Sequence, residues 1–160
     1  MEPETRIGLY ICHCGLNIAG VISPEALVTQ GQELPEVAIC RHHLYTCSEA
    51  GQAEILKDIK HFDLNRVVIA ACSPKLHEVT FRRLLVEAGL NPYLLEIVNI
   101  REQCTWVHGG EPEEAQEKAL ELIRMGLAKA RLAMPLEERL VPLTRHALVI
   151  GGGPAGLRAA

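Results

Sequence analysis

The chain has 160 residues, of which 48% are hydrophobic and 22% charged, with a formal net charge of −4. This length suffices for one well-packed core, since a domain of about 150 residues buries roughly two thirds of its unfolded surface. The interspersed charges exclude the basic footprint of a nucleic-acid-binding protein. No segment reaches the roughly 18 apolar residues of a membrane span, and the acidic start is unlike a signal peptide, so a cytoplasmic location is expected.

Four apolar segments predict the strands of a sheet. The first, residues 6–12, is closed by a Cys-x-Cys-Gly loop, and the second covers residues 36–40. Residues 65–74 form the clearest candidate, because their Val-Val-Ile run lacks polar interruption, as in a parallel strand that is covered on both faces. Residues 91–100 supply the fourth strand. All four are short and rich in strand-forming side chains.

Helical signals lie between and after these strands. Ser-Pro pairs at positions 23–24 and 73–74 are typical of an N-cap followed by the first helical residue. Thr46 and Glu49 stand in capping-box spacing, which predicts that Cys47 lies in the first turn of a helix. Helices are therefore expected over residues 24–30, 46–62, 74–88 and 113–134, the last of them long and amphipathic.

Alternating strands and helices predict an α/β fold: a doubly wound, mainly parallel four-stranded sheet with flanking helices, Rossmann-like or flavodoxin-like, and a long C-terminal helix. We expect this domain to occupy residues 1–134. Residues 135–145 contain two prolines and are interpreted as a linker to a second unit that starts at 146–160. In such sheets, ligands bind beyond the carboxyl ends of the strands.

Five of the six cysteines are expected at that edge of the sheet. A disulfide framework is not expected in a reducing cytosol, so the cysteines are either core residues or ligands. Each of the five follows a predicted strand or opens the next helix; they are Cys12, Cys14, Cys47, Cys72 and Cys104. Cys40 ends an apolar run and is interpreted as a small buried hydrophobe.

Four thiolates suit either a 4Fe-4S cluster or a zinc ion. The long spacings between the cysteines match neither the Cys-x2-Cys pairs of zinc ribbons nor those of bacterial ferredoxins, so the sequence does not distinguish the two metals. A helix N-terminus would ease deprotonation of Cys47. Positive potential is expected from Arg41, Lys75 and Arg101. Five histidines near these loops remain open as ligands or hydrogen-bond donors to ligands: His13, His42, His43, His77 and His108.

The last residues carry a glycine pattern. Gly151, Gly153 and Gly156 form G-x-G-x-x-G between a predicted strand and a helix start, the fingerprint of dinucleotide binding. The acidic residue expected about 20 positions further on falls beyond the sequence, so residues 146–160 are expected to be the entry to a dinucleotide-binding domain and not to hold the cofactor alone.

Several stretches in one order resemble a known family. They include RIGLYICHCGLNIAGV, YTCSEAGQ, RVVIAACSPKLHEVTFRR, AGLNPYLLEIVNIREQCTWVH and ALVIGGGPAG. The chain resembles the N-terminal part of the A subunit of heterodisulfide reductase and its bacterial relatives. The resemblance implies an iron-sulfur flavoprotein with a 4Fe-4S cluster, followed by an FAD domain. It implies Cys47, Cys72 and Cys104 as ligands, with Cys14 or Cys12 or both.

The resemblance also implies partners: the other subunits of a heterodisulfide reductase-like complex and a ferredoxin or hydrogenase-type electron donor, with a homodimer as a further option. Our leading hypothesis is an electron-transfer module that is not catalytic alone, within an oxidoreductase. A zinc-stabilised or metal-free docking domain of a multisubunit reductase is the alternative. Thiol catalysis is a third, disfavoured because no Cys-x-x-Cys pair is present.

Overall fold

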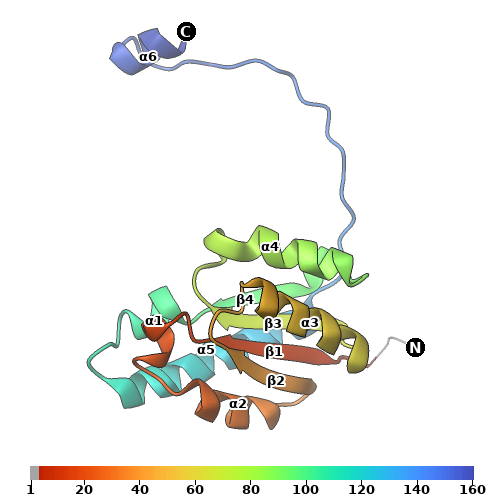
Figure 1. The fold of residues 1–160 in the computed structure, drawn as a ribbon. Helices are drawn as coiled ribbons and strands as arrows, with labels where there is room; N and C mark the ends of the chain where they lie inside the picture. Colours follow the sequence, from red (N-terminus) through yellow and green to blue (C-terminus); the bar gives the residue numbers. More distant parts are fainter. Residues whose placement is uncertain (1–3) are drawn as a thin grey trace.

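The computed structural model describes residues 4–160 and contains one four-stranded parallel sheet in the order β2-β1-β3-β4 (Figure 1). The strands are β1 (Ile7–Cys12), β2 (Val37–His43), β3 (Arg66–Ala71) and β4 (Leu95–Asn99). All three pairings are parallel. The predicted α/β class and the parallel sheet are confirmed, and the carboxyl ends of all four strands lie at one edge.

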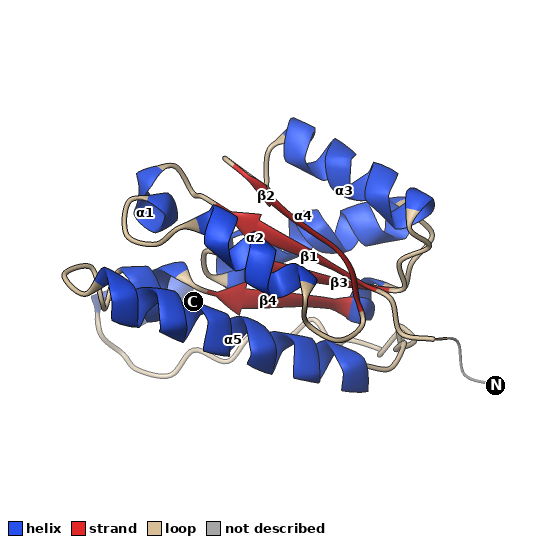
Figure 2. Cartoon of the chain, turned by 90° about the horizontal axis from the view of Figure 1, so that it is seen from below, coloured by secondary structure: helices blue, strands red, loops and turns tan. Residues whose placement is uncertain are grey.

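Helices cover both faces of this sheet. The main ones are α2 (Pro24–Gln32), α3 (Glu49–His61), α4 (Pro74–Glu87) and α5 (Pro112–Leu132). Helices α3 and α4 lie on one face and α2 and α5 on the other, as Figures 1 and 2 show from two directions. The fold is thus doubly wound, with the long helix α5 predicted from the sequence. None of the helices within residues 4–160 has the length and apolar character needed to cross a bilayer.

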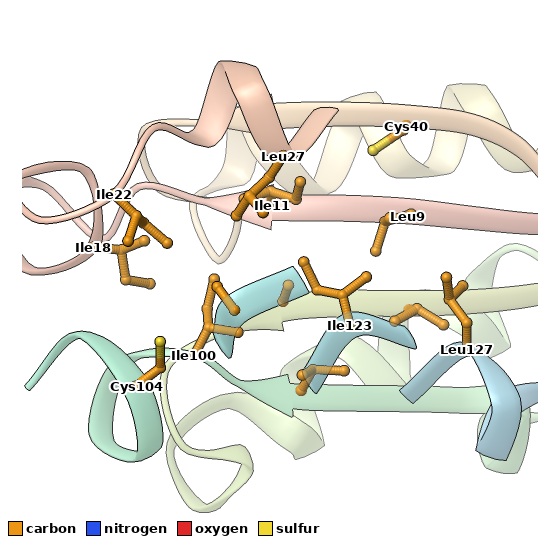
Figure 3. Packing of buried hydrophobic residues seen from close by; sticks show 14 of the residues in the cluster. Leu9, Ile11, Ile18, Ile22, Leu27, Cys40, Ile100, Cys104, Ile123 and Leu127 are labelled. Atoms are coloured by element: carbon orange, nitrogen blue, oxygen red, sulfur yellow. The ribbon is translucent and has the colours of Figure 1, made fainter. Parts of the chain in front are cut away.

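Each face of the sheet has its own hydrophobic core. Alternate residues of β1 point to opposite sides: Leu9 and Ile11 belong to the cluster under α2 and α5, whereas Tyr10 and Cys12 belong to the cluster under α3 and α4. Figure 3 shows the first cluster, in which Ile123 of α5 lies among the strand residues. Because β1 is buried on both faces, its sequence is a continuous apolar run.

Helix α3 begins later than the capping-box spacing predicts, and that prediction is wrong. Ser48 is the N-cap, and its hydroxyl accepts a hydrogen bond of 3.2 Å from the backbone N–H of Gly51. Ser48 is followed by Glu49 as the first helical residue, so Cys47 lies in the preceding turn and outside the helix. Ser and Thr compete as caps, and spacing alone does not choose between them.

Four further segments differ from expectation. Asn91 and Pro92 open a 3-10 turn, η1 (Pro92–Leu94), so β4 starts only at Leu95. The predicted loop after β4 begins with a turn of π-helix, η2 (Arg101–Thr105), and a short helix α1 (Leu16–Ala19) follows the Cys-x-Cys loop. Residues 133–152 form no helix or strand, so the strand expected before the glycine pattern is not formed in the described chain.

The contact between α5 and β4 depends on a glycine. Gly126 is buried, and a Cβ atom at this position would collide with Cγ2 of Val98. Alanine is the better helix former by about 1 kcal/mol, but overpacking a core costs about 1–3 kcal/mol. We expect Gly126→Ala to lower the free energy of unfolding by on the order of 1 kcal/mol, measured by urea denaturation.

The control is the double variant Val98→Ala/Gly126→Ala, which removes the colliding methyl groups. The decrease in its free energy of unfolding should be smaller than the sum of the decreases for Val98→Ala and Gly126→Ala by at least about 0.5 kcal/mol, as expected for residues in contact. A stabilised Gly126→Ala protein would contradict the close approach of α5 and β4.

Candidate metal centre

Four cysteines line one small cavity at the carboxyl edge of the sheet. Cys12 is the last residue of β1, Cys14 lies in the loop after it, Cys47 precedes α3 and Cys72 follows β3. The cavity has a volume of about 60 Å³ and lies on the side of the sheet covered by α3 and α4. The topology thus assembles thiols from three separate connections at one place, as parallel sheets do with ligand sites.

The local backbone fixes two of these thiols. Cys14 has a φ of 49° and Gly15 one of 61°, so the chain turns sharply after β1. This turn brings the backbone N–H of Cys14 to 3.3 Å from Sγ of Cys12, and the N–H of Thr46 lies 3.4 Å from the same sulfur. Backbone donors of this kind favour a negatively charged sulfur.

Arg101 supplies the positive charge at the cavity. Its Nη1 lies 2.9 Å from Sγ of Cys14, and its Nη2 lies 2.8 Å from Oε1 of Glu102. The guanidinium also stacks over the Trp106 ring, 4.7 Å from the ring centroid. Glu102 is in turn held by the backbone N–H of Ser73 at 2.9 Å. The arginine is therefore oriented toward the thiols by its neighbours.

Burial is the largest influence on the pKa of two of these thiols, Cys47 and Cys72. It raises the pKa of Cys72 to about 11, against the lowering effect of Arg101 and with a further rise from the neighbouring cysteines. Burial also raises the pKa of Cys47, followed by the effect of Cys12. The prediction that a helix N-terminus eases deprotonation of Cys47 is therefore wrong, because this residue is outside α3 and desolvation outweighs its backbone hydrogen bond.

Two buried polar atoms at this cavity have no hydrogen-bond partner. They are Oγ1 of Thr46 and Nε of Arg101, and both residues line the same cavity as the four cysteines. An unpartnered buried donor costs about 1–3 kcal/mol, so such atoms call for an explanation. Sulfur acceptors at the centre of the cavity would give both a partner, and the donor set thus fits a sulfur-rich inorganic group.

Cys104 does not line this cavity, although the sequence predicts it among the five thiols at this edge. It is fully buried in the cluster under α2 and α5 (Figure 3). Its Sγ donates a hydrogen bond to the carbonyl oxygen of Ala115 at 3.1 Å. The π-helical turn η2 places Arg101 in the cavity and Cys104 on the opposite side. Burial raises the pKa of the Cys104 thiol.

Cys40 is the buried core residue that the sequence predicted. It packs beside Gly31 and Leu9 under α2, and burial raises the pKa of its thiol to about 12. Of the three basic residues considered near the thiols, Arg101 lies at the cavity. Arg41 instead pairs with the buried Asp58, with Nε 2.6 Å from Oδ2.

The five histidines separate into different surroundings. His77 lines the cysteine cavity. His13 and His42 meet on the other face of the sheet edge, and burial followed by the charge of His42 lowers the pKa of His13. Nδ1 of His43 accepts a hydrogen bond from the backbone N–H of Tyr45. Nδ1 of His108 lies 3.7 Å from Oε2 of Glu111.

The glycine pattern forms the turn that its spacing predicts. Gly153 caps helix α6 (Pro154–Ala159), Gly151 has a φ of 108°, and a Cβ atom at Gly156 would meet the carbonyl oxygen of Gly151. The close approach of helix and loop is the role that the third glycine has in a dinucleotide fingerprint. This part of the prediction agrees with the structure, although the strand before it does not form.

Sequence reasoning missed Thr46, Tyr45 and Glu102 as parts of the site. The capping-box spacing predicts Thr46 as a helix cap, yet its backbone N–H contacts Sγ of Cys12 and its hydroxyl lies unpartnered at the cavity. Its only sequence signal was its position just before Cys47. Glu102 follows Arg101 directly, and this adjacency was the available hint that the arginine is anchored.

The fold and the site define a class: a doubly wound α/β domain whose cysteines, drawn from separate connections, gather at the carboxyl edge of the sheet. No family model matches the chain. It is 55% identical over 159 residues, 99% of its length, to the second form of the iron-sulfur A subunit of CoB–CoM heterodisulfide reductase from Methanopyrus kandleri. The chain is thus a close homologue of the A subunit of heterodisulfide reductase, which is an oxidoreductase.

Two further relatives give the same result. The chain is 56% identical over 157 residues to the A subunit of the H(2):CoB–CoM heterodisulfide,ferredoxin reductase of Methanothermobacter thermautotrophicus, covering 98% of this chain. It is 43% identical over its full length to the iron-sulfur A subunit of the CoB–CoM heterodisulfide reductase of Methanocaldococcus jannaschii. The chain spans 24% of the length of each of these three relatives.

The raised pKa of Cys72 gives a pH-dependent prediction for the metal-free protein. Only the thiolate reacts with iodoacetamide, and with a pKa of about 11 very little thiolate exists at pH 8. We expect Cys72 to be alkylated on the order of 100-fold more slowly at pH 8 than free N-acetylcysteine, whose pKa is near 8.5, with the rate still rising up to pH 11. Peptide mass spectrometry reports the modified residue; a plateau below pH 9 would contradict the burial of this thiol.

Proposed function

We propose that this chain binds one 4Fe-4S cluster through Cys12, Cys14, Cys47 and Cys72, as an electron-transfer module of a heterodisulfide reductase-like A subunit. The observation that carries the proposal is the convergence of these four thiols on one small cavity, with Cys12 and Cys72 buried and Cys14 and Cys47 half-buried. A 4Fe-4S cluster supplies one-electron transfer when it is bound. The chain's own residues hold, shield and charge-balance the site, and the module makes or breaks no bond by itself.

The spacing of the thiols supports a cluster over a single zinc ion. Zinc–sulfur bonds of about 2.3 Å in a tetrahedron hold the sulfurs about 3.8 Å apart. Among residues 4–160, no three cysteine sulfurs lie within 4.8 Å of one another. A centre of several iron atoms holds its thiolates further apart than one ion does, so it is favoured over zinc by sulfurs that are not closely grouped.

The charges around the cavity support the same assignment. Four thiolates with a cluster carry net negative charge, which a low-dielectric site tolerates only with nearby positive charge and hydrogen bonds. Arg101 contacts Cys14, and backbone N–H groups contact Cys12. The raised pKa values of Cys47 and Cys72 disfavour free thiolates there, which argues against thiol catalysis.

We extend the proposal to the electron partners. The turn formed by Gly151, Gly153 and Gly156 supports a dinucleotide, which we propose to be FAD, as the group that exchanges electrons with the cluster. The name of the Methanothermobacter thermautotrophicus relative includes hydrogen, heterodisulfide and ferredoxin. Other subunits of such a complex, with a ferredoxin or hydrogenase-type donor, are therefore the proposed protein partners, and a cytoplasmic location remains a prediction.

Anaerobic reconstitution with iron and sulfide tests the proposal. We expect about four iron and four sulfide per chain, and an electron paramagnetic resonance signal after reduction. Serine variants at Cys12, Cys14, Cys47 and Cys72 should each lower the iron content. Zinc or no metal in the reconstituted wild type would instead favour the docking-domain alternative.

Two matched controls decide between ligand sets. Cys40→Ser and Cys104→Ser replace buried cysteines on the opposite face of the sheet, and both variants should retain the iron content of the wild type. Loss of iron in a folded Cys104→Ser protein would mean that the chain rearranges to bring this thiol to the cluster, as the family resemblance implies. It would thereby overturn the assignment of four ligands made here.

Arg101 should set the reduction potential of the bound centre. Positive charge and hydrogen bonds to sulfur stabilise the more negative, reduced state, so Arg101→Met should lower the midpoint potential. Protein film voltammetry or a dye-mediated redox titration provides the measurement. Arg82→Met is the control, because Arg82 pairs with Glu78 on α4 away from the cysteines; an equal shift in both variants would contradict a local effect of Arg101.

A further inference from the structure

The histidine of the Cys-His-Cys sequence faces away from the cysteines. Alternate residues of a strand point to opposite sides, and Cys12 packs on the α3 side whereas Ile11 packs on the α2 side. His13 follows the second pattern, because its ring meets Glu25 of α2 and His42 of β2. The cluster ligands and this histidine therefore belong to different sites.

Three potential metal ligands converge on that other face. The ligand atoms of His13, Glu25 and His42 all lie within 4.8 Å of one another. Nε2 of His13 is 2.7 Å from Nδ1 of His42, and the ring centroids are 4.9 Å apart with an interplanar angle of 20°. The two rings thus meet through their nitrogen edges, and a hydrogen bond joins them in the absence of an ion.

Rigid elements position all three side chains. His42 is paired with Ile11 in the sheet, and the backbone N–H of His13 donates to the carbonyl oxygen of His43 at 2.9 Å. Glu25 lies in the first turn of α2, where its Oε2 accepts from Oγ of the cap residue Ser23 at 3.1 Å. A ligand set that is held by a sheet and a capped helix is preorganised.

From this geometry we propose a second metal site, in which His13, His42 and Glu25 bind one divalent first-row transition-metal ion, with Zn²⁺ as its representative. Two imidazoles and a carboxylate form a donor set typical of zinc and related ions. Zinc–nitrogen bonds of about 2.0–2.1 Å place two ligand nitrogens about 3.3 Å apart, so the rings need to separate by roughly 0.6 Å. The ion replaces the shared proton and leaves open positions for water or another ligand.

Such an ion would link α2, through Glu25, to the ends of β1 and β2, through His13 and His42. His13 is the residue between Cys12 and Cys14, so the same ion would fix the loop that carries two of the proposed cluster ligands. The site nevertheless uses none of the cysteines, and its existence does not depend on iron binding.

Zinc titration with a chromophoric chelator as competitor, followed by zinc X-ray absorption, tests this site. We expect wild-type protein to bind zinc with a first shell of nitrogen and oxygen at about 2.0–2.1 Å. His42→Gln should weaken the affinity for the zinc ion that has nitrogen and oxygen ligands at least about tenfold. Even residues that do not bind the metal directly change metal affinity by that factor. His146→Gln, which alters an exposed histidine in residues 133–152, should bind as wild type does.

Glu25→Ala provides a second variant at an exposed helix position, in case His42→Gln does not fold, and far-UV circular dichroism checks both. The proposal is overturned if zinc shows only sulfur ligands at about 2.3 Å, or if a folded His42→Gln or Glu25→Ala protein binds zinc as tightly as wild type. Iron and sulfide content, measured on the same variants, reports the cysteine site separately, so the failure of one site is distinguishable from that of the other.

Discussion

The site depends on the direct, parallel pairing of β1 and β3. Ile11 lies opposite Ala70, so both strands end at the same level and deliver Cys12 and Cys72 to neighbouring positions. The same sheet edge receives the turn after β2, which brings Cys47. A parallel sheet forces long connections between such strands, and this is why ligands that share one cavity come from widely separated parts of the sequence.

Much of this arrangement follows from pattern and topology. Uninterrupted apolar runs identified β1 and β3 as strands covered on both faces, and the alternation with helices predicted the parallel sheet. Knowing that carboxyl ends share an edge was sufficient to place Cys12, Cys14, Cys47 and Cys72 together. None of this required a recognised metal motif, because the prediction concerned the direction of the strands rather than the spacing of the ligands.

The same reasoning failed where the fine geometry of a turn decides which way a side chain points. Cys104 does follow β4, but η2 begins at Arg101 and turns the chain so that the arginine enters the cavity and the cysteine enters the core. The start of α3 was misplaced for a similar reason, since Ser48 competes with Thr46 as a cap. Sequence patterns locate a residue along an element better than they fix its orientation in a loop.

The alternation of side chains along β1 and the residue after it explains how residues 10–13 contribute to both faces of the sheet. Tyr10 and Cys12 face α3, where Tyr10 contacts Asp58 and Cys12 lines the cavity together with the other thiols. Ile11 and His13 face α2, where the first packs in the core and the second meets His42. The register of β1 with β2 preserves this division, since Tyr10 pairs with Arg41 and Ile11 with His42. A one-residue shift would exchange the two faces, burying imidazoles at the cavity and exposing thiols beside α2, so the packing of β1 and β2 also fixes the chemistry at the edge of the sheet.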